Sequence, residues 1–476
     1  MISFTVSTFI TRQSLIRFST LLLVFVTLCS SFSVTTTAFV APQRTRQHPH
    51  PKRLSQNDHP IRQRQRQPFN DNNIKKSSSY SSSSTSILQF WSRSDPPISS
   101  LVDVSANYTL AATDDIVHLH EGQRLVCLGD VHGDVEALRE FLTLAQVYDP
   151  HTDSWCGNNA ILVQCGDILD RGTQELQCLQ LLAKMSHQAQ AQNGKVIVLV
   201  GNHEVLNAMG LFQYALGDEE YEERVAPVVD AQLGTKAWRK QYVGNQPARW
   251  ATYEPGGLLA ASLLANMKVA VKVGRTVLVH AGLRPEHIQK YGGIPGMNQA
   301  FRDWIQLSVT SGWSGDNPVT YNNRGKYVTP NMAIQDAERR QTYYINSIPE
   351  FLSGGVGATG PIWMRDYSSP SDMPPRNPQA QTMIDQTLDL LNADRMVMGH
   401  TIQRQINGAL DGKAWRVDVG ASRGCIAGAP EVLEIARVCV DSEYYGSSCE
   451  EQMSVLTKHG KVPADQRLVT AMINYL

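Results

Sequence analysis

Short apolar runs recur along the chain from about residue 115 onward, and each of them ends in glycine and polar residues. Most of the runs are continuously apolar rather than alternating, which is the pattern of strands buried on both faces. Helix-like stretches separate the first three runs, so the pattern predicts βαβ units and a layered α/β domain. The runs are RLVCLGD (124–130), AILVQCGD (160–167), KVIVLVGN (195–202), TVLVHAG (276–282), RMVMGH (395–400) and WRVDVG (415–420).

The intervals between these runs are uneven, which predicts insertions in the domain. The first three runs follow one another closely, whereas long intervals lie on either side of the fourth run. We expect the residues at about 205–270 and at 284–394 to form helical cap elements over a site at the strand ends. The catalytic domain would then cover 115–435, and a C-terminal extension would cover 436–476.

Polar side chains stand at the ends of the apolar runs, where ligands bind in layered α/β domains. Charged groups at the end of a buried strand cost desolvation free energy unless cations neutralise them. Carboxylates, imidazoles and an amide suit manganese, iron or zinc ions. Two such ions, about 3.5–4 Å apart, can clamp a phosphoryl group and activate a water molecule for in-line attack on phosphorus. The candidate ligands are Asp130, His132, Asp167, Asn202, His280 and His400.

Within this set, the spacing predicts a pair of ions that share one carboxylate. Asp130 and His132 are two positions apart, so both can turn towards one ion where the strand opens into a loop. Asp167 has two oxygens and can bridge both ions, and the remaining three residues would complete the second ion's shell. Each residue alone also has an ordinary structural interpretation, as a turn or a core histidine. The ordered set at successive strand ends favours a dinuclear metal site.

Five short motifs coincide with these strand ends: GDVHGD (129–134), GDILDRG (166–172), GNHE (201–204), HAG (280–282) and GHT (399–401). Together they resemble the calcineurin-like metallophosphoesterase superfamily, and within it the phosphoprotein phosphatase branch of the Shewanella-like type. The resemblance implies an αββα sandwich and a hydrolase that removes phosphate from phosphoproteins with two divalent ions, manganese foremost.

The same resemblance implies roles for residues beside the metal ligands. His203 would be the general acid, paired with Asp170, and Arg171 would bind the phosphate. A second phosphate-binding arginine is expected in the family, and the candidate is Arg365 in GPIWMRD (360–366). Two further arginines, Arg416 and Arg423, are alternatives to Arg365.

The chain also departs from other branches of the superfamily. It has VHAG where eukaryotic Ser/Thr phosphatases carry HGG, and no SAPNY segment follows GHT. Position 402 is isoleucine, so the GHxH pair of nucleotidases, cyclic-nucleotide phosphodiesterases and purple acid phosphatases is missing. The WRVDVGASRG stretch at 415–424 is similar to that of Shewanella-like members.

Two other functions stay open from the sequence. One is a dinucleoside-tetraphosphate hydrolase or small-molecule phosphatase on the same scaffold, and the other is an inactive relative that serves as a binding scaffold. The formal net charge of −1 argues against nucleic acid as the main partner. The intact set of ligands argues against the inactive scaffold.

The first 38 residues have the build of a signal peptide. The apolar run LLLVFVTLC (21–29) is too short to span a bilayer, and Arg12 and Arg17 precede it. A signal anchor is the alternative, and we expect no stable membrane span in the mature chain.

The next segment, 39–100, is basic and rich in serine. Ten lysines or arginines lie between Phe39 and Arg93 against only two acids, Asp58 and Asp71. Such a composition predicts disorder and is typical of a transit peptide. A signal followed by this segment, with Phe39 at the junction, resembles the bipartite plastid presequences of algae with secondary plastids. The alternative is a secreted protein with a disordered basic stalk.

The eight cysteines have no regular spacing and do not describe a disulfide scaffold. Cys127 and Cys165 lie inside apolar runs and are expected in the core. We expect Cys425, Cys439 and Cys449 to be surface thiols or core residues, with a regulatory disulfide as the less favoured alternative.

Overall fold

The computed structural model describes residues 107–233, 239, 245–306, 337–354, 357–442 and 446–469. All of them belong to one unit of the chain, Ser84–Leu476. The signal-like and transit-like segments predicted at 1–38 and 39–100 lie outside the described residues. Among the helices of the described part, none is both long and apolar enough to cross a membrane.

Two six-stranded sheets form the centre of the domain. One has the order β1-β7-β8-β9-β11-β10, and the other has the order β14-β13-β12-β2-β5-β6. The first sheet consists of β1 (Ile116–Val117), β7 (Ala270–Val273), β8 (Thr276–Val279), β9 (Arg395–Met398), β10 (Asn407–Ala409) and β11 (Ala414–Arg416). The second consists of β2 (Arg124–Leu128), β5 (Ile161–Gln164), β6 (Lys195–Val198), β12 (Val432–Ser442), β13 (Gly446–Thr457) and β14 (Gly460–Pro463). A separate small hairpin joins β3 (Tyr148–Asp149) to β4 (Ser154–Trp155).

All six apolar runs form strands, as predicted: β2, β5, β6, β8, β9 and β11. Strands β2, β5 and β6 are parallel neighbours, so the predicted βαβ units are present. The helices that connect them are α3 (Val135–Leu144) and α4 (Glu175–Gln190). Helix α3 begins directly after the first motif because Asp134 caps it, accepting a hydrogen bond from the Ala137 amide at 3.3 Å.

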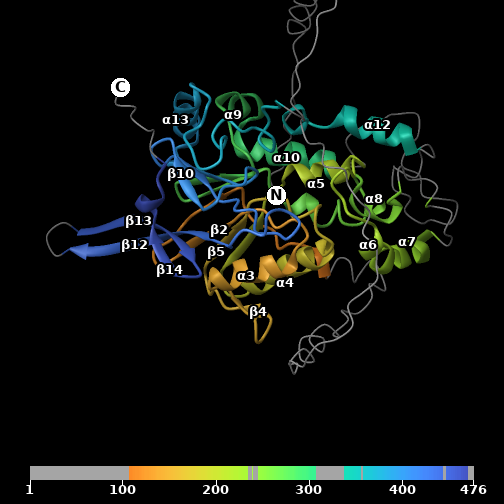
Figure 1. The fold of residues 1–476 in the computed structure, drawn as a ribbon, viewed down its shortest axis with the longest axis horizontal. Coiled ribbons are helices and arrows are strands. Elements are labelled where there is room, and N and C mark those ends of the chain that lie inside the picture. Colours follow the sequence, from red (N-terminus) through yellow and green to blue (C-terminus); the bar gives the residue numbers. More distant parts are fainter. Residues whose placement is uncertain are drawn as a thin grey trace, which may run out of the picture. The chain divides into compact units, whose positions relative to one another are not determined.

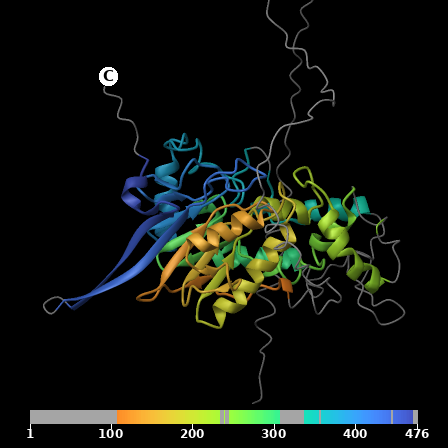
Figure 2. The same ribbon diagram turned by 60° about the horizontal axis from the view of Figure 1, so that its bottom comes forward.

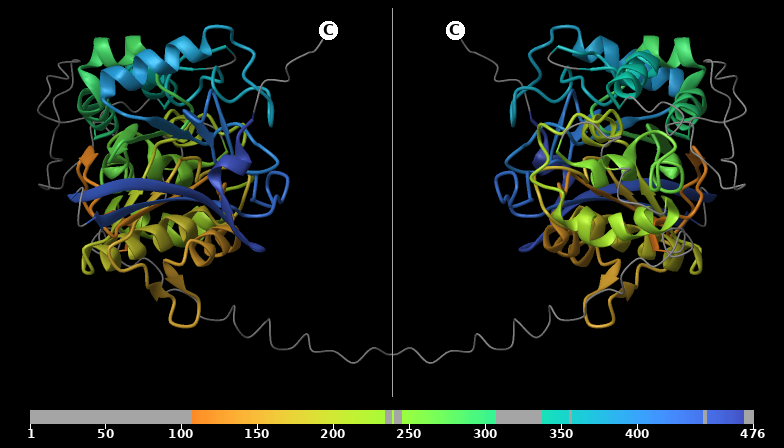
Figure 3. Two further views of the ribbon diagram at one scale, coloured as in Figure 1. Left: turned by 90° about the vertical axis from the view of Figure 1, so that its left-hand side faces the viewer. Right: turned by 90° about the vertical axis from the view of Figure 1, so that its right-hand side faces the viewer.

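Helices cover the outer faces of both sheets, which makes the domain an αββα sandwich. Figure 3 shows α3 and α4 on one side of the paired sheets and a second group of helices on the other. That second group consists of α9 (Pro285–Tyr291), α10 (Gly293–Gln306) and α13 (Ala380–Leu391). Helix α9 contacts both α10 and α13, and α10 contacts β7. The predicted fold class is therefore confirmed.

A group of short helices lies beside the sandwich, at the right of Figure 1. It contains α5 (Asn202–Ala208), α6 (Glu219–Arg224), α7 (Ala226–Leu233), α8 (Pro247–Tyr253) and α12 (Ala337–Ser347). Helix α6 contacts α7 and α8, α8 contacts α5, and the Trp250 and Tyr344 rings join α8 to α12. We call α6, α7 and α8 the cap. Three short 3-10 helices complete the described elements: η3 (Leu264–Asn266), η4 (Glu350–Leu352) and η5 (Ala464–Arg467).

The two predicted insertions differ from the structure in their extent. The cap lies within the first, but the last residues of 205–270 already lead into strand β7. The second, 284–394, is not one cap element, because α9, α10 and α13 form a layer of the sandwich. These helices have apolar faces that pack inwards, with Ile294, Phe301 and Ile384 buried.

The predicted boundary between the catalytic domain and a C-terminal extension at 436 falls inside strand β12. That strand pairs with β2, with Leu433 opposite Cys127, so the C-terminal residues add three strands to the second sheet. Figure 2 shows β12 and β13 as a long ribbon that extends beyond the neighbouring strands.

The cysteines of this ribbon correct a further expectation. Cys439 and Cys449 face each other in the β12–β13 register and form a disulfide bond. Cys127 and Cys165 are buried free thiols, as expected, and Cys425 is a partly buried free thiol.

Candidate active site

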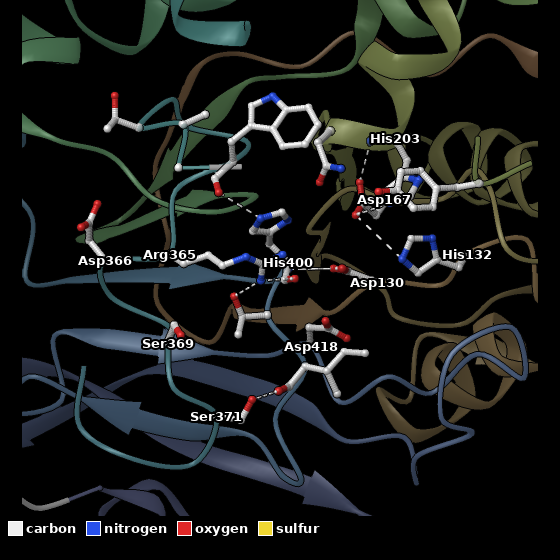
Figure 4. A pocket seen from close by; sticks show the side chains of 18 of the residues that line it. Asp130, His132, Asp167, His203, Arg365, Asp366, Ser369, Ser371, His400 and Asp418 are labelled. Atoms are coloured by element: carbon white, nitrogen blue, oxygen red, sulfur yellow. Dashed lines mark hydrogen bonds and ion pairs between the residues drawn. The ribbon is translucent and has the colours of Figure 1, made fainter. Parts of the chain in front are cut away.

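A cavity of about 780 Å³ opens where the strands of both sheets end. Figure 4 shows side chains that line it, contributed by loops far apart in the sequence. Of the six predicted metal ligands, five line the cavity, and the sixth, His280, is fully buried against two of them. The lining residues predicted from the sequence are Asp130, His132, Asp167, Asn202, His400, His203, Arg171 and Arg365.

The loop after β5 holds Asp167 in a conformation that side chains rarely adopt. Its φ angle is +56°, in the left-handed region. The buried Glu204 carboxylate stabilises this turn by accepting hydrogen bonds from the amides of Asp167 at 3.0 Å and Ile168 at 2.8 Å. Gly201 is required beside it, because a Cβ atom there would lie 2.1 Å from the Asp167 Oδ1 atom. Glycine at position 201 therefore leaves room for the Asp167 carboxylate.

Hydrogen bonds orient the histidine rings towards the cavity. Because a carbonyl can only accept, His132 donates from Nδ1 to the Leu169 carbonyl at 2.9 Å, and His280 donates from Nδ1 to the Cys165 carbonyl at 2.7 Å. His400 donates from Nε2 to a backbone carbonyl at 3.1 Å. These bonds turn the second nitrogen of each ring towards the cavity, which is how metal-binding histidines are held.

Asp167 belongs to two groups of potential metal ligands. One group is His132, Asp167 and His203, and the other is Asp167, His280 and His400, with ligand atoms in each group within 4.8 Å of one another. The Asp167 Oδ2 atom lies 3.8 Å from His132 Nε2 and 3.3 Å from His280 Nε2. Asn202 adds its Oδ1 atom 3.1 Å from His280 Nε2. One carboxylate therefore lies between two ligand sets.

Two further carboxylates lie close to Asp167. Asp130 accepts hydrogen bonds from the His400 amide at 3.2 and 3.3 Å, and its pKa is raised well above the usual range by burial and by the charges of Asp418 and Asp167. Burial raises the pKa of Asp418 to about 6. We call Asp130, Asp167 and Asp418 the carboxylate floor. Three buried carboxylates with this mutual repulsion, beside oriented imidazoles, fit divalent cations.

His203 and Asp170 form a buried pair next to the floor. The His203 ring lies 2.6 Å from Asp170 Oδ2 through its Nδ1 atom, and Asp170 Oδ1 accepts a hydrogen bond from Asn207 at 2.9 Å. Burial would lower the pKa of His203, but the charges of Asp167 and Asp170 outweigh burial and raise it. The His203 Nε2 atom is 3.8 Å from Asp167 Oδ2, so the ring faces the cavity.

Arginines surround the floor on the more exposed side of the cavity. The Arg171 Nη2 atom lies 3.3 Å from His203 Nε2, and Arg365 donates to the Thr401 hydroxyl at 2.7 Å. Both line the cavity, together with Arg284 and the exposed Arg376. We call these four residues the arginine rim: Arg171, Arg284, Arg365 and Arg376.

The structure separates Arg365 from the two alternative phosphate-binding candidates. Arg416 is fully buried and donates to the Met373 carbonyl at 2.9 Å, so it holds a loop rather than facing the cavity. Arg423 is paired with Asp134 at 2.7 Å, and neither Arg416 nor Arg423 lines the cavity.

Comparisons with known proteins agree with this geometry. Residues 123–331 match the calcineurin-like phosphoesterase family. Shewanella-like protein phosphatase 2 of Arabidopsis thaliana is 31% identical over 375 residues, which are 71% of this chain and 85% of that protein. The chain belongs to the Shewanella-like protein phosphatase family. The predicted family and the predicted hydrolase class are therefore confirmed.

Other relatives of this Shewanella-like phosphatase match it less completely. Shewanella-like protein phosphatase 1 of Plasmodium berghei is 38% identical over 91 residues, which are 19% of this chain and 25% of that protein. A solved cold-active protein tyrosine phosphatase is 19% identical, with a TM-score of 0.48, and the match covers 74% of this chain and 82% of that one.

Among the cavity-lining residues that were not predicted from the sequence, Asp418 and Tyr214 lie beside the predicted site residues. Asp418 stands at the end of the sixth apolar run, and its position at a strand end was a signal that could have identified it. Tyr214 places its ring 5.0 Å from the His203 ring and 5.9 Å from the Arg171 guanidinium. It follows no strand and belongs to no motif, so nothing in the sequence marked it.

Proposed function

We propose that this phosphatase removes phosphate from phosphoproteins, using two divalent metal ions held at the carboxylate floor. The observation that supports the proposal best is the position of Asp167 between two ligand sets. When bound, the two ions would neutralise charge on the phosphoryl group and lower the pKa of a water molecule. Manganese suits the mixed oxygen and nitrogen donors.

We divide the proposed ligands between the two ions as in the sequence analysis. Asp130, His132 and Asp167 would hold one ion. Asp167 would also hold the second ion, and the remaining ligands of that ion would be Asn202, His280 and His400. The hydrogen bonds to backbone carbonyls fix which nitrogen of each histidine would face the ion.

Arg171 and Arg365 would bind the phosphate from the rim. Each guanidinium can donate two parallel hydrogen bonds to phosphate oxygens, which fixes the orientation of the group. The side chains come from different parts of the chain, the loop after β5 and the segment before α13. Their convergence on one cavity supports a tetrahedral anion as the ligand.

His203 would give a proton to the departing oxygen, with Asp170 holding its ring. The same ring could also serve as a metal ligand, because it groups with His132 and Asp167. Its contact with Asp170 favours the role of acid, since the carboxylate orients the ring and helps to raise its pKa. The charge of Arg171 acts in the opposite direction on this pKa, so the part proposed for Arg171 is to bind the phosphate.

The size and charge of the cavity favour a phosphoprotein over a small phosphate ester. A cavity of about 780 Å³ is far larger than one phosphate group, and its outer part is lined by Arg284, Arg376 and Asn377. These groups can hydrogen bond to the peptide around a phosphorylated residue. They could also accept a polyphosphate chain, which keeps the dinucleoside-tetraphosphate alternative in the test.

The test is a substrate panel assayed with the purified protein and Mn²⁺. We expect turnover of phosphopeptides and loss of that turnover after chelation, with recovery when Mn²⁺ is added back. Hydrolysis of diadenosine tetraphosphate with no hydrolysis of any phosphopeptide would contradict the proposal. An intact, metal-loaded protein that hydrolyses neither would favour the inactive scaffold.

We also propose delivery to a plastid, on the composition of residues 1–100 alone. A fluorescent reporter fused to these residues should enter plastids in an alga with secondary plastids. Phe39→Ala should divert the fusion from the organelle. Secretion of the unaltered fusion would show that the segment is a signal followed by a basic stalk.

A further inference from the structure

The cap contributes a buried arginine to the far side of the His203–Asp170 pair. Arg249 lies on helix α8 and is 1% exposed. One of its nitrogens, Nη1, donates to Asn207 at 2.8 Å and lies 3.4 Å from Asp170 Oδ1. The other oxygen of Asp170 faces His203. Asp170 is thus held between the imidazole on one side and Arg249 with Asn207 on the other.

A second buried carboxylate completes this arrangement. Glu175, at the start of α4, forms an ion pair with the Arg249 Nη2 atom and accepts hydrogen bonds from the Asp170 amide and the Tyr221 hydroxyl. The Arg249 guanidinium also lies over the Tyr221 ring, 4.6 Å from its centroid. The Tyr221 ring of the cap therefore packs against the Arg249 guanidinium, and the carboxylates of Asp170 and Glu175 form ion pairs with it.

The charges in this buried cluster balance only when Arg249 is present. Asp170 and Glu175 supply two negative charges, and Arg249 supplies one of the two positive charges when His203 is protonated. Without the guanidinium, two buried carboxylates would share one imidazolium. Unpaired buried charge is costly, so the side chains of the cluster would rearrange. This change would alter how Asp170 accepts from His203.

We propose that Arg249 is a positioning residue for the general acid, through which the cap holds the Asp170 carboxylate aimed at His203. The inference rests on the proposed role of His203 as the acid. It assigns the cap a part in catalysis that no motif of the sequence indicates. The backbone adds to the need for such support, because Asp170 has a φ angle of +69° and its loop is not held by regular structure.

The chain offers a matched control for a purely structural effect. Arg340 is also buried beside the cap, pairs with Glu254 at 3.3 Å and lies over the Trp250 ring at 5.0 Å. Like Arg249, it is a buried guanidinium with a carboxylate partner and an aromatic neighbour. Its carboxylate partner is not part of the His203 pair.

The experiment compares leaving groups. p-Nitrophenolate departs without a proton, whereas unsubstituted phenolate needs one, so loss of the acid shows mainly on phenyl phosphate. We expect Arg249→Met to lower kcat on phenyl phosphate at least about 10-fold more than on p-nitrophenyl phosphate, within the 10²–10⁴-fold span of general acid catalysis. His203→Asn removes the proposed acid itself and should show the full difference between the two esters. Arg340→Met should lower both rates by the same factor.

Arg249→Lys keeps the charge but loses the planar fork, so its leaving-group ratio should lie between those of the wild type and Arg249→Met. This milder variant carries the test if Arg249→Met does not fold. Equal losses on both esters for the Arg249 variants, beside a clear difference for His203→Asn, would overturn the inference alone. A His203→Asn variant with no leaving-group difference would instead overturn the proposed acid.

Discussion

The carboxylate floor and the arginine rim of the same cavity hold charge in opposite ways. The floor residues Asp130, Asp167 and Asp418 are each no more than 3% exposed, so their charges repel one another without water to screen them. The rim arginines are partly exposed, and Arg284 pairs with Asp366 at 2.7 Å while Arg376 reaches solvent. Figure 4 shows Asp366, Ser369 and Ser371 on the side of the cavity away from Asp167.

This difference supports the ligand proposed for each part. Buried carboxylates need a permanent counter-charge, which a resident cation supplies. Partly hydrated guanidinium groups are stable in contact with water and can exchange that water for a transiently bound anion. A phosphate ester would therefore bridge the two regions, with its oxygens between the cations of the floor and the arginines of the rim.

The largest effect is expected at the centre of the floor. Asp167→Asn keeps one oxygen but loses the charge that offsets two cations. Turnover should fall below detection, and metal content measured by elemental analysis should drop well below that of the wild type. Normal metal content with full activity would show that Asp167 is not shared by two ions.

An intermediate effect is expected at the rim. Arg171→Ala should lower kcat/KM by about 100-fold, since a charge-assisted hydrogen bond contributes roughly 1.5–3 kcal/mol. Metal content should stay at the wild-type level, which separates this change from one in the floor. The control is Arg423→Ala, which removes an arginine that pairs with Asp134 outside the cavity. Loss of metal in Arg171→Ala would show that a rim residue supports metal binding, which would contradict the separate roles proposed for floor and rim.

The smallest effect on catalysis is expected at Glu220 of the cap, away from both regions. Glu220 accepts hydrogen bonds from the first amides of α4, and burial raises its pKa from 4.5 to about 7. A carboxyl group with a raised folded pKa binds more protons when folded, so it makes stability fall as pH rises from about 4.5 to about 7.

Glu220→Gln removes this titration. Between about pH 4.5 and pH 7, the free energy of unfolding of Glu220→Gln should fall less than that of the wild type. The difference between the two falls should reach up to about 3 kcal/mol, and urea denaturation at several pH values would measure it. Because the hydrogen bonds of Glu220 go to the α4 amides and its ion pair to Arg224, rather than to Arg249 or Asp170, the leaving-group ratio should not change. Parallel pH profiles for the two proteins would contradict the raised pKa.

The parts of the fold that could be predicted are those that depend on local pattern. The runs that became β2, β5 and β6 are continuously apolar because both faces of each strand are covered. The ribbon of β12 and β13 escaped prediction because its residues are mixed in polarity and gain their structure by pairing, β12 with β2 and β13 with β12. The pairing of β12 with β13 brings Cys439 opposite Cys449, which no spacing in the sequence could reveal.

For the site, the sequence by itself determined which chemical groups stand at the strand ends, because motif glycines and apolar runs are local features. The six candidate ligands follow from that pattern, since parallel strands end on one edge of a sheet. Tertiary structure alone decided which nitrogen of each histidine faces the cavity, and it decided that Tyr214 lines the cavity and that Arg249 contacts Asp170. Those contacts join residues far apart in the chain, such as Arg249 and Asp170, and they form only when the cap packs against the sandwich. Local periodicity carries no information about such packing, so these contacts could not be predicted from the sequence.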